Sequence, residues 1–209
     1  LRTPLAAMRI NVEALQSYVS SDRQQALLAG IIRSNSRAAR LVNQLLLLMH
    51  SEARMDAVME PVALTTLIQE RMAVLAPLAA ERRVELEFYS HDDAWITGVR
   101  ERLMSLIDNV IENAVKYSPE GGRVEVDVRV LDKSTELRVS DAGPGIPVEL
   151  RARVFDRFFR DPNQIQSGSG LGLAIVKAVA QQHSSNVSLS TSAEGGLMVT
   201  VEFPHRQLG

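Results

Sequence analysis

The chain has 209 residues, of which 45% are hydrophobic and 23% charged, a composition that fits one large or two small globular domains. Its net charge of −2 gives no electrostatic reason to expect binding to nucleic acid or to a membrane surface. Because the sequence contains no cysteine, disulfides and thiolate metal sites are excluded.

Two predicted helices occupy residues 1–58. Apolar residues recur at alternating intervals of three and four within 1–19 and again within 28–49, which is the pattern of a coiled-coil seam. The polar residues 20–22 favour a helix start, so the two helices should form an antiparallel hairpin. Because two helices cannot bury two seams, we expect the hairpins of two copies to form a dimeric four-helix bundle. A hairpin that packs against the rest of its own chain is the alternative.

The beginning of the sequence leads to an expectation about whether the chain is a fragment. The longest strongly apolar run, Leu45–Met49, is too short to span a membrane, and no signal peptide is visible. The first residue is Leu1 rather than a methionine, and it falls inside the first helical pattern. We therefore expect the chain to be a fragment of a longer protein.

The rest of the chain mixes helical and alternating patterns. Residues 59–63 are predicted to be a linker, because Pro61 would stop the preceding helix. In 64–209, helices are predicted at 64–82, 100–117 and 171–183, and strands at 84–88, 94–99, 124–128, 136–139, 187–189 and 198–203. The third and fourth of these strands should form a hairpin. Helices on one face of a mainly antiparallel sheet would give an α+β sandwich.

Three polar residues lie on one face of the predicted helix 100–117. Asn109, Asn113 and Lys116 follow one another at intervals of four and three, and Tyr117 adds a flat ring. Amide oxygens are hard ligands suited to Mg²⁺, and the lysine adds a positive charge for the same phosphates. Taken alone, these asparagines are better explained as solvent-facing surface residues.

Two glycine-rich turns flank the second half of the chain. Asp141, Gly143 and Gly145 follow a predicted strand, and the aspartate there could accept a hydrogen bond from an amino group of a base. Residues 167–173, with three glycines, run directly into a helix, where backbone N–H groups and the helix dipole favour phosphate. The alternatives are an ordinary Gly/Pro turn and a flexible loop before a helix. The second turn matches neither the P-loop nor the dinucleotide-binding fingerprint.

An aromatic segment lies between the two glycine turns. Residues 155–160 contain three phenylalanines, and the polar residues 161–167 that follow suit a hinged lid. We expect Phe155 and Phe158 to be part of the core.

The order of these motifs resembles that of the bacterial sensor histidine kinases of two-component signalling, over nearly the whole chain. Residues 109–118 (NVIENAVKYS) resemble the N box of that family, and residues 141–145 (DAGPG) its G1 box. Residues 155–159 (FDRFF) resemble the F box, and residues 168–172 (GSGLG) the G2 box. Residues 1–5 (LRTPL) resemble the end of the H box.

The resemblance implies a fold and a set of functional residues. A dimerising phosphotransfer hairpin (1–58) and a linker (59–63) would precede an ATP-binding sandwich of the gyrase, histidine kinase and MutL type (64–209). Asn113 would bind Mg²⁺, Lys116 would contact phosphate and act in catalysis, and Asp141 would bind the adenine amino group. The remaining residues of the implied nucleotide site are Asn109, Tyr117, Gly143, Gly145, Phe159, Arg160, Gly168, Gly170, Leu171 and Gly172.

The chain departs from the family pattern at the acceptor. The phospho-accepting histidine and its acidic neighbour would stand immediately before Leu1, and none of His50, His91, His183 and His205 can replace that histidine, so each is expected to be structural or on the surface. Thr3 would share the helix face of the missing histidine, and the resemblance implies a role for it in dephosphorylating the partner.

Two smaller departures lie near the end of the chain. Ser184 and Ser185 stand where the family often has two glycines, which should make that turn less sharp. Leu197 stands where a threonine is frequent, which should remove a polar contact near the adenine.

The function implied is that of a homodimeric histidine kinase core. It would bind ATP and Mg²⁺, phosphorylate a histidine, and pass the phosphoryl group to an aspartate of a response regulator. The chain would be the cytoplasmic portion of an inner-membrane sensor. One alternative is a gyrase- or MutL-like ATPase, for which Glu112 is the candidate water-activating acid. The other is a pseudokinase that dimerises without using ATP.

Overall fold

The computed structural model describes residues 15, 24–25, 27–32, 34–35, 38, 42, 58–90, 93–161, 166 and 168–205. The chain divides into two compact units, Leu1–Arg54 and Met55–Gly209. All described residues of the first unit are helical, as the seam pattern predicts. Leu28 is buried there, whereas Leu15 and Ile31 remain 53% and 49% exposed. Among the described helices of both units, none combines the length and apolar character needed to cross a membrane.

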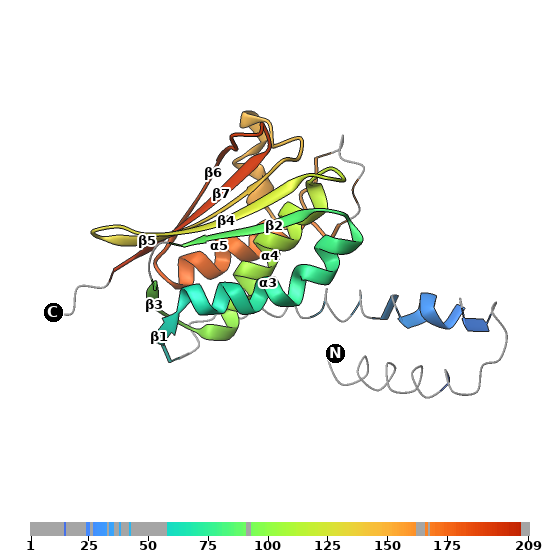
Figure 1. Ribbon diagram of the computed structural model, residues 1–209, viewed down its shortest axis with the longest axis horizontal. Helices are drawn as coiled ribbons and strands as arrows, with labels where there is room; N and C mark the ends of the chain where they lie inside the picture. The colour runs from blue at the N-terminus through green and yellow to red at the C-terminus, as the bar shows by residue number, and fades with distance from the viewer. Residues whose placement is uncertain are drawn as a thin grey trace. The chain divides into compact units, whose positions relative to one another are not determined.

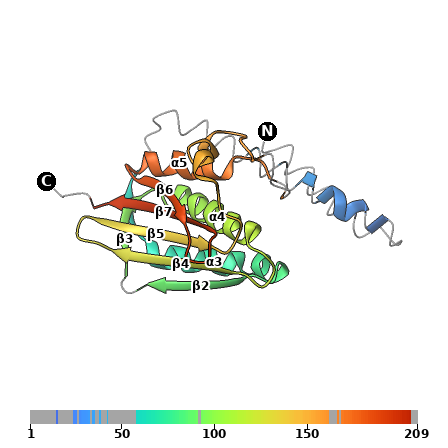
Figure 2. The same cartoon turned by 90° about the horizontal axis from the view of Figure 1, so that it is seen from above.

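A five-stranded sheet forms one layer of the second unit (Figures 1 and 2). Its order is β2 (Glu85–Ser90), β4 (Arg123–Val130), β5 (Ser134–Asp141), β7 (Leu197–Pro204) and β6 (Asn186–Thr191). The pairing of β2 with β4 is parallel, and the other three pairings are antiparallel. The predicted hairpin is therefore confirmed as β4 and β5.

Three helices cover one face of this sheet (Figure 1). They are α3 (Leu64–Glu81), α4 (Arg100–Tyr117) and α5 (Gly172–Gln182), and α4 packs against both of the others. The strands alternate accordingly: in β4, Val124, Val126 and Val128 are buried, while the residues between them are partly exposed. The predicted α+β sandwich is confirmed, and the apolar stripe of α4 lies at its centre.

A second, two-stranded sheet lies apart from the first. β1 (Glu60–Ala63) pairs antiparallel with β3 (Trp95–Gly98), so that Pro61 lies opposite Thr97 and Val62 is buried. Residues 60–63, which the sequence pattern assigned to a linker without regular structure, thus form a strand. Proline is tolerated at this place because a two-stranded sheet leaves one side of each strand without a backbone partner.

The connection from β5 to α5 contains two short 3-10 helices that the sequence pattern did not predict. They are η1 (Val148–Leu150) and η2 (Arg153–Phe155). Both are single turns without an apolar repeat, which explains why periodicity did not reveal them. This connection carries the aromatic segment and leads to the second glycine turn.

Candidate functional site

The polar face of α4 lies against the beginning of α5. A Cβ atom added to Gly172 would be 2.9 Å from Asn113 Nδ2 and 3.3 Å from Asn109 Oδ1. Asn109 is itself oriented by a hydrogen bond from its Nδ2 to the carbonyl of Ser105, at 2.7 Å. A side chain at this position would push at least the Asn113 amide aside, so the N-terminus of α5 and the two asparagines form one cluster.

Lys116 joins this cluster at the end of α4. A Cβ atom on Gly168 would lie 2.6 Å from Lys116 Nζ, so the second glycine turn directly faces the ammonium group. The same Nζ donates to the Tyr117 hydroxyl at 3.2 Å and lies 4.5 Å from the centre of its ring. A positive charge and the start of a helix, which also attracts anions, are thus side by side.

The first glycine turn forms the other end of the candidate site. Gly143 packs on the C-terminus of α4, because a Cβ atom there would lie 2.7 Å from the Tyr117 carbonyl oxygen. Gly145 has a φ of +69°, which a glycine adopts without steric cost. The turn therefore follows β5 and returns against the helix that carries the asparagines.

Asp141 is a buried carboxylate at the end of β5. Its Oδ1 accepts hydrogen bonds from the backbone N–H groups of Gly143 (2.9 Å) and Leu197 (3.0 Å). Burial raises the pKa of Asp141 above its ordinary value, and the two N–H groups offset part of this increase. Both donors reach Oδ1, so the second carboxylate oxygen, Oδ2, is not engaged by these two N–H groups.

Leu171 anchors the second glycine turn. Its side chain is fully buried, and its backbone N–H is 3.3 Å from Ser169 Oγ. Gly170 has a φ of +69° and its carbonyl accepts a hydrogen bond from the Phe158 N–H at 2.9 Å. The turn that faces Asn113 and Lys116 is therefore fixed to the core on one side and to the aromatic segment on the other.

Comparison with known proteins decides the family. Residues 98–207 match the family described as histidine kinase-, DNA gyrase B-, and HSP90-like ATPase, and residues 1–54 match the His Kinase A (phospho-acceptor) domain. The chain belongs to the sensor histidine kinases.

Named relatives agree with this assignment. The chain is 36% identical over 213 residues to the sensor protein kinase PmrB of Pseudomonas aeruginosa, with 99% of this chain and 44% of the relative covered. It is 32% identical over 208 residues to the signal transduction histidine-protein kinase BaeS of Escherichia coli, with 98% and 44% covered. The chain thus spans less than half the length of these relatives.

Solved structures share the fold. The mycobacterial sensor histidine kinase MprB superposes with a TM-score of 0.64 at 34% identity, covering 72% of this chain and 100% of that one. Full-length ShkA, solved in complex with AMPPNP, superposes with a TM-score of 0.82 at 25% identity, covering 97% and 43%. The implied family and its ATP-binding sandwich fold are confirmed.

The aromatic segment, residues 155–160, differs from our expectation. Phe158 is 60% exposed and Phe155 is only partly buried, so the prediction that both belong to the core is wrong. Phe158 has a φ of +64°, an unusual conformation for a bulky residue, and its backbone is held against Gly170. That conformation depends on a contact distant in sequence, which a local pattern does not reveal.

Other predicted site residues lie away from the cluster or outside the described residues. The Phe159 ring is stacked by the Arg153 guanidinium, whose central carbon is 4.5 Å from the ring centre. Arg160 donates to the Gln166 carbonyl at 2.7 Å, within the predicted lid. Thr3 lies outside the described residues, as do residues 162–165, so the predictions about them stay predictions.

His183 is a structural residue, as predicted. It is buried, its Nε2 accepts from the Val99 N–H at 3.0 Å, and its Nδ1 lies 2.7 Å from the Val179 carbonyl. The expectation of a less sharp turn after it is wrong, because Ser184 adopts a φ of +55° and the Ser185 N–H bonds to the Ala180 carbonyl.

Ser192 is the residue near this site that sequence reasoning missed. Its hydroxyl donates to the Asp141 carbonyl at 2.7 Å and accepts from the Gly196 N–H at 2.9 Å. The neighbouring Gly195-Gly196 pair was the available signal for a tight turn. The place of that turn beside Asp141 depends on the pairing of β5 with β7, which the sequence pattern left open.

Proposed function

We propose that this chain is the ATP-binding and phosphotransfer core of a two-component sensor kinase. It binds ATP with Mg²⁺, transfers the γ-phosphoryl group to a histidine just before the Leu1–Leu5 motif, and passes it to an aspartate of a response regulator. The observation that carries the proposal is the contact of Asn109, Asn113 and Lys116 with the glycine turn at the start of α5. The family membership supports it.

The nucleotide spans the two glycine turns in this proposal. Asp141 accepts a hydrogen bond from the adenine amino group, beside Gly143 and Gly145. The phosphates bind the backbone N–H groups of residues 168–172, where the dipole of α5 favours negative charge. Lys116 neutralises the same phosphates, and its stacking on Tyr117 holds the ammonium group in place.

The donor set fits Mg²⁺ that arrives with the nucleotide. In the described part of the chain, no group of three His, Cys, Asp or Glu side chains could hold a metal ion. Asn113 offers one hard oxygen, and Mg²⁺ readily takes its other ligands from phosphates and water. When bound, Mg²⁺ would neutralise negative charge on the phosphates.

Catalysis in this proposal is positioning and charge neutralisation. A neutral imidazole nitrogen forms a bond to the γ-phosphorus while the bond from that phosphorus to the β–γ bridging oxygen breaks, and ADP leaves. The acidic residue next to that histidine orients the ring. Lys116 and the N-terminus of α5 stabilise the negative charge on the transferring group. Thr3 acts in the opposing phosphatase activity, in which it orients a water molecule that attacks the phospho-aspartate and releases inorganic phosphate.

We further propose the partners of this core. The helical hairpin dimerises with a second copy, because the seam residues Leu15 and Ile31 stay half-exposed in one chain. The response regulator docks on the first helix, near residues 3–19. In the cell the core is the cytoplasmic portion of an inner-membrane sensor.

Calorimetry and phosphotransfer together test the proposal. Titration of ATP into the 209-residue chain should show one site per chain whose affinity requires Mg²⁺. No binding would favour the pseudokinase alternative. A version extended at its N-terminus to include the acceptor histidine should then form phosphohistidine; ATP hydrolysis without phosphohistidine would instead favour a gyrase-like ATPase with Glu112 as its acid.

A further inference from the structure

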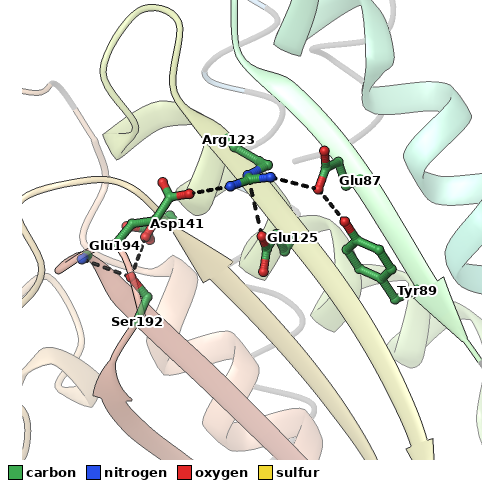
Figure 3. Close-up of polar contacts among 8 residues, drawn as sticks. Glu87, Tyr89, Arg123, Glu125, Asp141, Ser192 and Glu194 are labelled. Atoms are coloured by element: carbon green, nitrogen blue, oxygen red, sulfur yellow. Dashed lines mark hydrogen bonds and ion pairs between the residues drawn. The ribbon is translucent and has the colours of Figure 1, made fainter.

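A chain of polar contacts crosses the face of the sheet that the helices leave open (Figure 3). Arg123, at the start of β4, contacts three glutamates: Glu194 at 2.7 Å, Glu125 at 3.4 Å and Glu87 at 3.5 Å. Tyr89 donates its hydroxyl hydrogen to Glu87 at 2.5 Å. Glu87 and Tyr89 lie on β2 and Glu125 lies on β4, but Glu194 lies in the turn between β6 and β7.

The turn that carries Glu194 also holds Asp141. Ser192 Oγ donates to the Asp141 carbonyl, and the Leu197 N–H donates to Asp141 Oδ1. A Cβ atom on Gly196 would lie 2.1 Å from the Asp141 carbonyl oxygen, so the backbone of the turn is pressed against this residue. Any movement of the turn therefore moves the carboxylate or breaks a hydrogen bond to it.

Hydrogen bonds from the Ser192 N–H to the Gly196 carbonyl (3.0 Å) and from the Gly195 N–H to the Ser192 carbonyl (3.1 Å) close the base of the turn, but its tip consists of two glycines. Gly195 has a φ of +84° and no atom near its missing side chain, and Gly196 follows it. Two consecutive glycines lose more backbone freedom than other residues when they are ordered. A contact that fixes the turn from outside can therefore change how often Asp141 is correctly placed.

We propose that the Arg123–Glu194 ion pair is a tether that positions the β6–β7 turn, and through it Asp141, for recognition of the adenine base. This inference rests on the proposed nucleotide-binding function. Arg123 and Glu194 are positioning residues, because in this proposal they act on Asp141 only through the turn. The network fixes Arg123 in turn: Glu87 and Glu125 hold its guanidinium, and Tyr89 holds Glu87 (Figure 3).

Other ion pairs on this face are local to one strand. Arg129 bonds to Asp127 at 2.6 Å, and Arg138 bonds to Glu136. Among the described ion pairs of this face, only that of Arg123 reaches the β6–β7 turn. Since Arg123 and Glu194 are 42% and 41% exposed, the pair is screened by water and salt, and its loss should cost about two- to fivefold in affinity.

The test compares Glu194→Gln with Asp127→Asn, which breaks an ion pair on the same face without touching the turn. In the 209-residue chain, Glu194→Gln should weaken ATP–Mg²⁺ binding by about two- to fivefold and leave GTP–Mg²⁺ binding unchanged. The ratio of wild-type to variant ATP affinity should approach one in 1 M salt. Asp127→Asn should leave both affinities unchanged.

Amide hydrogen exchange without nucleotide provides the second measurement. Glu194→Gln should speed the exchange of the Gly196 and Leu197 N–H groups, and Asp127→Asn should not. If the wild type binds ATP and Glu194→Gln binds it with the same affinity, the tether is overturned and the proposed function stands. A wild type that binds no ATP would overturn the proposed function, and unchanged exchange in Glu194→Gln would independently overturn the tether.

Discussion

At the residue scale, two opposing effects act on the pKa of Asp141. Burial raises its pKa, and the N–H groups of Leu197 and Gly143 offset only part of this effect. In the unfolded chain the pKa returns to the ordinary value of about 3.9. Between the two pKa values the folded state binds more protons than the unfolded state, so the free energy of unfolding falls as pH rises through that window.

Asp141→Asn should therefore affect the free energy of unfolding and the affinity for ATP in different ways. Asparagine Oδ1 can still accept from Leu197 and Gly143, but Nδ2 replaces the oxygen that would accept from adenine. ATP affinity should fall by about tenfold or more. The stability of the variant relative to the wild type should rise as pH increases through the titration of Asp141. Calorimetry and urea unfolding between pH 4 and about pH 8 would check both effects; unchanged ATP affinity would place adenine recognition elsewhere.

Asn113 gives a second test at this scale. Asn113→Ala should reduce the affinity for ATP in Mg²⁺ to that of the wild type without Mg²⁺, because it removes the amide oxygen proposed as the Mg²⁺ ligand. Equal affinities for wild type and variant, measured by calorimetry at several Mg²⁺ concentrations, would mean that the cation ligand is another residue. Asp127→Asn, on the far face of the sheet, serves as the unaffected control.

At the element scale, regular elements followed from the sequence, and elements fixed by distant contacts did not. The predicted helix 100–117 has the bounds of α4, because its apolar stripe has a helical period along its whole length. Strand β1 was missed because Pro61 argues against a strand locally, and its pairing with β3 supplies what the local pattern lacks. The exposure of Phe158 was missed for the same reason, since its partner Gly170 follows a lid.

The contact of Phe158 with Gly170 predicts an effect of substitution in the second glycine turn. Gly170→Ala places a Cβ atom 2.7 Å from the Phe158 backbone and also strains a φ of +69°. Gly121 has a φ of +77° but nothing within 4 Å, so Gly121→Ala isolates the cost of φ, roughly 1–2 kcal/mol. Gly170→Ala should cost about 1–3 kcal/mol more in urea unfolding, and should also weaken ATP binding.

Equal stability losses in the two alanine variants would show that the Phe158 backbone moves away freely. In that case the contact between the second glycine turn and the aromatic segment does not contribute to the stability of the second unit.

At the scale of the whole molecule, the site joins segments far apart in sequence. The order of the motifs was enough to predict that α4 and the two glycine turns work together, and the structure places Gly168 and Gly172 against Lys116 and Asn113. The role of the β6–β7 turn was not visible, because hydrogen bonds such as Leu197 N–H to Asp141 join residues 56 positions apart. Sheet order determines such contacts, and the sequence pattern specified the strands without their order.

The exposed seam residues of the first unit lead us to predict that the whole molecule forms a dimer. Leu15 and Ile31 occupy predicted seam positions and are 53% and 49% exposed in a single chain. Burying such residues against a second copy is favourable by roughly 25 cal/mol per Å² of apolar surface. Charges at these positions should therefore oppose association: the double variant Leu15→Lys and Ile31→Lys should sediment as a monomer where the wild type sediments as a dimer.

Val74→Lys changes an equally exposed apolar residue of α3, in the second unit, and should leave the dimer intact. ATP affinity should remain unchanged in both variants, because the proposed nucleotide site belongs to the second unit. A Leu15→Lys and Ile31→Lys variant that remains a dimer would place the association surface outside the two seams.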